Sequence, residues 1–273
     1  MNEQQLYAPD LSSFQTGMFI ALIIMGAYFL YAYIKFKRAA VSVVAEQKIK
    51  KILQSHFAYY RRLSQPDQQE FVRRVCIFID RKSFIPRMFR VVTPDMKVLI
   101  AASAVQLTFG LPEITLQYFK RIIIYPENYY SVISKRMHKG EVNPKAQAIV
   151  LSWKNFLKGY QIPDDSYNLG LHEMAHALEL ENMIENDEYD FLPKESWKAF
   201  SQEAAAVVQD IKSGEHQFLR AYAATNMKEF FAVAVENFFE RPVAFKRELP
   251  RLYGILVLLL NQDPLNTVLY KSA

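Results

Sequence analysis

Cysteine and glycine are scarce in this chain of 273 residues, which has one cysteine, 8 glycines and no low-complexity tract. A single cysteine excludes an intramolecular disulfide framework and favours a reducing compartment. Cys76 stands among apolar neighbours with nothing nearby to activate its thiol, so we interpret it as core filling rather than as a catalytic nucleophile. Because 51% of the residues are hydrophobic, the chain is long enough for one substantial core and an appendage.

Charged residues are absent from residues 14–34, which read FQTGMFIALIIMGAYFLYAYI. A run of about 20 apolar residues is long enough to cross the hydrocarbon core of a bilayer, so this segment predicts a transmembrane helix. A secretory signal peptide is the competing interpretation. Residues 1–13 contain no lysine or arginine and no small-residue cleavage site follows the run, which disfavours a signal peptide.

Basic residues dominate the segment that follows the apolar run. Between residues 35 and 51 the only acid is Glu46, against Lys35, Lys37, Arg38, Lys48, Lys50 and Lys51. The positive-inside rule then places the rest of the chain in the cytoplasm and the N-terminus outside, in a single-pass protein of the inner (plasma) membrane. Lysines beside anionic headgroups also account for the net charge of +5, and no nucleic-acid-binding module is recognised, so nucleic acid is not an expected partner.

Residues 172–176 read HEMAH, the pattern H-E-x-x-H. On a helix His172 and His176 share one face and can bind one zinc ion, while Glu173 lies beside a zinc-bound water as general base. A turn at 163–166 and the apolar residues that follow predict a helix over 166–181. The alternative is that this spacing arose by chance on an ordinary amphipathic helix.

Helical periodicity predominates in the rest of the chain. The spacing and start signals predict helices over 41–57, 67–79, 93–109, 195–213, 227–239 and 253–260, and extended segments over 116–125 and 147–153. These expectations define a helix-rich α+β fold with a small sheet beside the metal-binding helix.

A catalytic zinc site needs a third protein ligand. Glu229 and Glu236 lie seven residues apart in an apolar stretch, and Tyr222 lies seven before Glu229, so one helical stripe could carry all three. Buried carboxylates need a metal or a hydrogen-bond network, but the two glutamates could also face solvent. Glu195 and Glu203 are nearer to His176 in sequence, and the spacing alone leaves these ligand candidates open.

Several motifs together resemble a known family. The chain contains V-L-S-W at 150–153, P-D-D with a following Asn at 163–168, L-H-E-x-A-H-x-L at 171–178, Y-A-A-T-N at 222–226, E-F-F-A-V-x-x-E-x-F-F-x-x-P at 229–242 and Q-D-P from Gln262. In order and spacing, over about 50–265, they resemble the Mlc titration factor A family of zinc peptidases. The catalytic core of that family is similar to that of anthrax lethal factor, so the resemblance implies a zincin-like metallopeptidase domain.

The resemblance also implies roles for individual residues. It implies that His172, His176 and Glu229 are the zinc ligands, Glu173 the general base and Tyr222 a transition-state stabiliser or proton donor. Glu236 would contact the ligands rather than the zinc ion. The chain departs from the family at Glu179, where an aspartate is usual, and at Glu181-Asn182, where an Asp-Gly pair is common.

These observations predict a membrane-tethered, cytoplasmic zinc peptidase acting on a peptide or protein substrate. We expect a short extracytoplasmic tail at 1–13, a transmembrane helix at 14–34, a basic juxtamembrane segment at 35–50 and the zinc peptidase domain at 51–273. The strand near 148–152 could hold an extended substrate at a sheet edge. The alternative is a regulatory module that sequesters a transcriptional regulator or another partner, with zinc mainly structural.

Overall fold

The computed structural model describes residues 20, 23–29, 45–131, 135–184 and 192–269. The chain divides into two compact units, 1–48 and 49–273. Of the predicted transmembrane segment 14–34, only residue 20 and residues 23–29 are described, and they are helical; the remainder, like the tail at 1–13, lies outside the described residues. Among the described residues, none of the helices combines the length and the apolar character needed to cross a bilayer.

The second unit is built around a four-stranded sheet. Its order is β1 (Ser83–Pro86), β2 (Arg121–Tyr125), β6 (Ala148–Ser152) and β5 (Gly140–Asn143). The first three strands are parallel, whereas β5 runs antiparallel to β6 at the edge of the sheet. Strands β3 (Tyr129–Ser131) and β4 (Arg136–His138) form a separate antiparallel pair just before β5.

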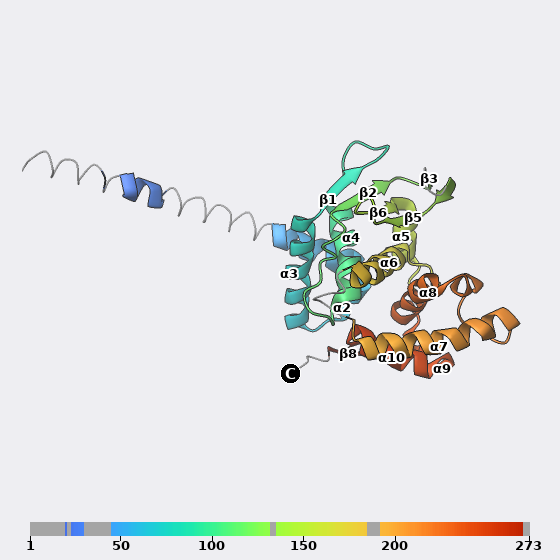
Figure 1. Ribbon diagram of the computed structural model, residues 1–273. Coiled ribbons are helices and arrows are strands. Elements are labelled where there is room, and N and C mark those ends of the chain that lie inside the picture. The colour runs from blue at the N-terminus through green and yellow to red at the C-terminus, as the bar shows by residue number, and fades with distance from the viewer. Residues whose placement is uncertain (1–19, 21–22, 30–44, 132–134, 185–191, 270–273) are drawn as a thin grey trace, which may run out of the picture. The chain divides into compact units, whose positions relative to one another are not determined.

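Helices make up most of this unit (Figure 1). In chain order they are a helix at 45–56, α2 (Ala58–Arg62), α3 (Gln65–Arg81), α4 (Pro94–Thr108), α5 (Trp153–Gln161), α6 (Leu169–Ile184), α7 (Lys194–Ser213), the 3₁₀ turn η1 (Ala221–Ala224), α8 (Met227–Glu240), α9 (Pro242–Glu248) and α10 (Pro250–Leu260). Two of these helices, α5 and α6, pack against strand β6, whereas the longest, α7, packs on other helices away from the sheet. A short pair, β7 (Gln262–Asp263) and β8 (Asn266–Leu269), follows α10.

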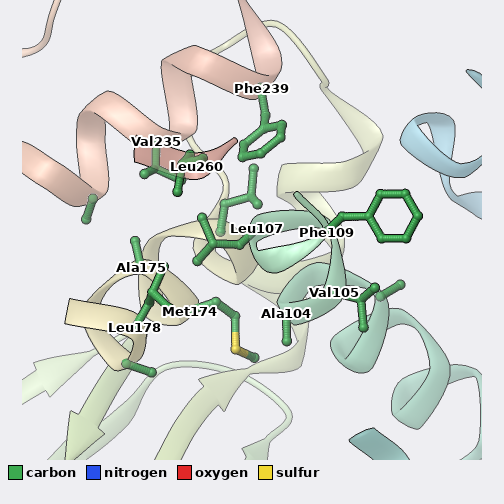
Figure 2. Close-up of a cluster of buried hydrophobic side chains, with 14 of the residues drawn as sticks. Ala104, Val105, Leu107, Phe109, Met174, Ala175, Leu178, Val235, Phe239 and Leu260 are labelled. Carbon is green, nitrogen blue, oxygen red and sulfur yellow. The ribbon is translucent and has the colours of Figure 1, made fainter. Parts of the chain in front are cut away.

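The core lies where α4, α6, α8 and α10 meet, as Figure 2 shows. Leu107 of α4, Met174 of α6 and Leu260 of α10 are fully buried there. Eleven consecutive residues of α4, from Val98 to Thr108, are buried, which agrees with the absence of charged residues from this stretch. The core therefore fixes α6 against α4 on one side and α8 on the other before any polar contact is considered.

The predicted class, a helix-rich α+β fold with a small mixed sheet, is confirmed. The predicted helices at 93–109, 195–213 and 227–239 correspond to α4, α7 and α8 within two residues at each end. The helix predicted over 67–79 begins earlier, at Gln65, because Ser64 caps α3 and its side chain accepts a hydrogen bond from the Asp67 amide. The expected strand at 116–125 is extended only from Arg121, since Leu116 has a positive φ of 51°.

Candidate functional site

Helix α6 carries the H-E-x-x-H motif, and its start is set by Asn168. The Asn168 side chain accepts a hydrogen bond of 3.0 Å from the Leu171 amide, the usual geometry of an N-cap. The predicted start at Ser166 was wrong, because Ser166 has a left-handed backbone with φ of 59°. The helix runs to Ile184, so His172 and His176 stand one turn apart well inside it.

Helix α8 supplies two carboxylates to the same place. Asn226 caps α8 by accepting a hydrogen bond of 3.0 Å from the Glu229 amide, which fixes Glu229 in the first turn. Glu236 follows two turns later on the same face. Helices α6 and α8 pack along each other, so both glutamates reach His172.

Three side-chain atoms converge between α6 and α8. His172 Nε2 lies 3.1 Å from His176 Nε2 and 3.1 Å from Glu229 Oε2, and His176 Nε2 lies 3.4 Å from that same oxygen. Ligands of a tetrahedral ion bound at about 2.0–2.1 Å are about 3.3–3.4 Å from one another. Glu229 Oε2 is also buried and has no hydrogen-bond partner among the described residues. The three residues therefore fit a zinc ion, which would satisfy this oxygen and both nitrogens.

The opposite nitrogen of His172 is held by a second carboxylate. His172 Nδ1 donates to Glu236 Oε1 at 2.5 Å, so its Nε2 lone pair is left for a metal. Arg220 donates to both oxygens of Glu236, at 2.7 and 2.9 Å. The backbone amide of Asn168 also donates to Glu236 Oε2, at 3.0 Å. Burial favours the protonated form of Glu236, but the hydrogen bonds from His172 and Arg220 outweigh it and lower the pKa of this carboxyl.

Glu173 lies on α6 between the two histidines and is 5% exposed. Its carboxyl packs against Gly140 at the start of the edge strand β5, where a Cβ would lie 2.6 Å from Glu173 Cδ. Only glycine, which has no Cβ, fits at position 140, so β5 and α6 can approach closely at this point. Burial raises the pKa of Glu173, with the two histidines acting in the opposite direction.

Tyr222 lies on the 3₁₀ turn η1, which packs against α8. One helical stripe could carry Tyr222, Glu229 and Glu236 only if the helix extended back to Tyr222, and it does not, because α8 begins at Met227. The ring of Tyr222 nevertheless stands 6.2 Å from that of His172, and the side chain is 48% exposed. Burial, followed by the negative charge of Glu229, raises the pKa of Tyr222 to about 12, so its hydroxyl remains a donor at neutral pH.

The structure brings together all five residues assigned from the sequence: His172, Glu173, His176, Tyr222 and Glu229. The competing third-ligand candidates lie elsewhere: Glu195 is exposed at the start of α7, and Glu203 faces Arg251 at 3.5 Å.

Two residues of the site were not found from the sequence, Gly140 and Arg220. Gly140 gives room to Glu173, and Arg220 binds Glu236. Arg220 stands two positions before Tyr222, but its guanidinium reaches Glu236 across a turn that no sequence pattern marks.

The positions that depart from the family pattern have structural partners. Glu181 is buried and accepts hydrogen bonds from the amides of Gln117 and Tyr118, at 2.6 and 3.3 Å. It thereby anchors the loop that leads into β2. Glu179 is buried near His176, Glu229 and Lys228, and burial raises the pKa of its carboxyl.

Comparisons with known proteins show the family of this chain. A family described as glucose-regulated metallo-peptidase M90 matches residues 34–260, which include β5, α6, η1 and α8. An uncharacterized protein of Synechocystis is 25% identical over 224 residues, covering 75% of this chain and 80% of that protein. Proteins named Mlc titration factor A from Yersinia pestis and Yersinia pseudotuberculosis are each 27% identical over 224 residues, covering 74% of this chain and 80% of theirs. The resemblance to the Mlc titration factor A family is confirmed, and the chain belongs to the glucose-regulated metallo-peptidase M90 family.

Proposed function

We propose that this chain is a zinc-dependent peptidase that hydrolyses peptide bonds in peptide or protein substrates. The observation that carries the proposal is the convergence of His172, His176 and Glu229 within 3.1–3.4 Å of one another. Two histidines and one carboxylate leave a fourth coordination position for water or substrate, which distinguishes catalytic zinc sites from closed structural ones. Membership in a metallopeptidase family supports the same reaction class.

Zinc bound at this centre would polarise the scissile carbonyl and lower the pKa of water toward about 7. Glu173 accepts the proton of the attacking water, and its burial favours proton uptake at neutral pH. The Tyr222 hydroxyl donates to the oxygen on which negative charge develops. Glu236 keeps His172 in one orientation, and Arg220 compensates the charge of Glu236.

The edge strand β5 is the candidate surface for an extended substrate. Among the described strands, β5 pairs only with β6, and it begins at Gly140 against the carboxyl of Glu173. A peptide added along this edge would pass the reacting groups, with its backbone held by strand hydrogen bonds. The expectation that the strand at 148–152 holds the substrate was wrong, because β6 pairs with β2 on one side and β5 on the other.

We further propose that residues 14–34 tether the peptidase to the inner membrane, with the catalytic domain in the cytoplasm. The uncharged run and the lysines after it support this topology. The apolar side chains of the described helical residues 23–29 are exposed, among them Ile23, Ile24 and Phe29. Exposed apolar side chains in such a run suit a lipid environment.

A second candidate function is a regulatory module that sequesters a transcription factor. It is motivated by the name of the Yersinia relatives, Mlc titration factor A, and would make zinc mainly structural. The two candidates differ in one consequence. Removing the base Glu173 should abolish peptide hydrolysis in the enzyme, whereas a sequestering module needs no base.

The substitution Glu173→Gln tests the enzyme. We expect about one zinc per chain and a loss of peptide-hydrolysing activity of about 10²–10⁴-fold, because the amide cannot accept the proton while the three ligands are untouched. Metal content by mass spectrometry and cleavage of a peptide library measure the two outcomes. Glu203→Gln is the matched control, since Glu203 lies on α7 away from the histidines, and it should leave both unchanged. Retained activity in Glu173→Gln would refute its role.

A further inference from the structure

A separate cavity of about 340 Å³ is lined by segments far apart in sequence, among them Asn168 and Leu171 at the start of α6. Its walls come from residues 55–63, Gln106 of α4, the end of α5, the end of α8 and the turn at 262–266. None of the five residues of the proposed active centre lines it. Asn168 lines it and also contacts Glu236, so the cavity and the metal centre share one residue.

Two buried acceptors in this cavity lack a donor. Gln106 is 5% exposed, and neither its Oε1 nor Glu240 Oε2 has a hydrogen-bond partner among the described residues. The other oxygen of Glu240 accepts a bond of 3.1 Å from Asn168 Nδ2. A buried acceptor without a donor costs about 1–3 kcal/mol. The cavity is therefore built to receive an occupant that donates hydrogen bonds.

The surroundings of Glu240 favour a cationic donor. None of the ion pairs between described residues includes Glu240. The negative charges of Glu236 and Asp165 lie near it, and so does the positive charge of Arg241, whose guanidinium donates to the Phe218 carbonyl and to Asn237. Burial is the main cause that raises the pKa of Glu240 to about 8. Aromatic rings of Tyr59, Tyr160 and Phe239 line the same cavity, and ring faces attract cations.

Exposed residues of the cavity lining carry the opposite charge. Arg61 and Arg62, in the last turn of α2, line the cavity and are exposed, as is His56. Arg61 makes one long bond of 3.3 Å to the Gln54 carbonyl, and most of its guanidinium donors are left for an anion. The lining of the cavity thus combines exposed cationic side chains with buried hydrogen-bond acceptors.

We propose that this cavity binds a small zwitterion of the α-amino acid class. Its ammonium group donates to Glu240 and Gln106, and its carboxylate faces Arg61 and Arg62. The volume lies at the lower end of the roughly 300–1,000 Å³ typical of small-molecule pockets, which suits a single amino acid. A simple anion would leave the buried acceptors unsatisfied, and a polyol would make no use of the arginines. The proposal does not depend on peptidase activity.

Binding is measured on the full chain by calorimetry and by thermal shift, with each of the common L-amino acids as probe. For any amino acid that binds, the matched probes are its N-acetyl form, which lacks the ammonium, and its amide, which lacks the carboxylate. We expect the free amino acid to bind and both modified forms to bind at least ten-fold more weakly. Binding of none of the amino acids, equal binding of the N-acetyl form, or binding of sorbitol instead would overturn the proposal.

Two variants assign the binding to this cavity. Without a ligand Glu240 is largely protonated at neutral pH, since its pKa is about 8, and a bound ammonium favours the carboxylate form. Glu240→Gln keeps an oxygen for Asn168 but cannot form this carboxylate, and should weaken binding about 10- to 100-fold, the equivalent of a charged hydrogen bond. Arg61→Ala with Arg62→Ala changes only exposed side chains and should weaken binding about three- to ten-fold while the fold is kept. The control pair, Arg87→Ala with Arg90→Ala, removes two exposed arginines that do not line the cavity. Unchanged affinity in both test variants, with a folded protein, would contradict the assignment.

Discussion

The substitution Gly140→Ala should disable the proposed catalytic base without touching a metal ligand. A Cβ at this position would lie 2.6 Å from Cδ and 2.7 Å from Cγ of Glu173, where ordinary contacts begin at 3.4 Å. All three nearest atoms to the new methyl belong to Glu173, and none to His172, His176 or Glu229. Either the carboxyl of Glu173 or the edge strand β5 must therefore move by about 1 Å.

The size of the effect follows from how little freedom Glu173 has. Its side chain is 5% exposed and packed between α6 and β5, so it cannot swing into solvent to avoid the methyl. A displacement of about 1 Å in a catalytic group costs on the order of 10²-fold in rate. Overpacking at a buried contact costs about 1–3 kcal/mol in the free energy of unfolding. We expect kcat/KM for a peptide substrate to fall about 10²-fold, with about one zinc per chain retained.

The assay combines peptide cleavage, metal analysis and urea denaturation of the variant. Gly254→Ala is the matched control, because a Cβ at Gly254 on the exposed side of α10 meets nothing within 4 Å. This control should keep full activity and gain about 0.5–1 kcal/mol, since alanine is the better helix former. If Gly140→Ala retains activity within about three-fold of the wild type, the contact between β5 and Glu173 does not hold the base in place.

Three further outcomes are expected. Tyr222→Phe should lower kcat about 10²–10³-fold with KM and zinc content nearly unchanged, as for a lost transition-state contact; near-normal turnover would make Tyr222 an ordinary aromatic. Protease added to intact cells should spare a C-terminal tag, and its degradation would reverse the proposed topology. Burial lowers the pKa of Lys82 from 10.5 to about 8, so the unfolded chain binds the proton more tightly between these values. The difference in the free energy of unfolding between the wild type and Lys82→Met should therefore increase from about pH 8 to 10. Urea titrations that give the same difference at every pH would contradict this.

Long elements with clear start signals were predictable from the sequence, and short polar ones were not. Thr93 caps α4 with a bond of 3.3 Å to the Met96 amide, and the uncharged stretch after it could only be a buried helix. In contrast, β5 reads Gly-Glu-Val-Asn, which lacks the apolar alternation of a strand and resembles a turn. It becomes a strand only because β6 offers it an edge, a tertiary cause that local patterns do not carry.

The same division applies to the site. Spacing alone brought His172 and His176 together, because an interval of four is one turn of a helix. Spacing did not favour Glu229 over Glu195 or Glu203 as the third metal ligand. Only the family motifs distinguished Glu229 from the other two. The contact of Gly140 with Glu173 joins a strand to a helix, so no local pattern could have revealed it.

Asn168 shows how several of these features depend on one another. Its side-chain oxygen caps α6, its backbone amide donates to Glu236, and its side-chain amide donates to Glu240. Glu236 in turn holds His172, so the start of the helix, the orientation of a metal ligand and one wall of the cavity share a single residue. In the sequence Asn168 stands out only as a polar residue near the start of a predicted helix and as the last residue of one family motif. Its importance comes from the packing of α6 on α8, which turns a local helix cap into the junction between two sites.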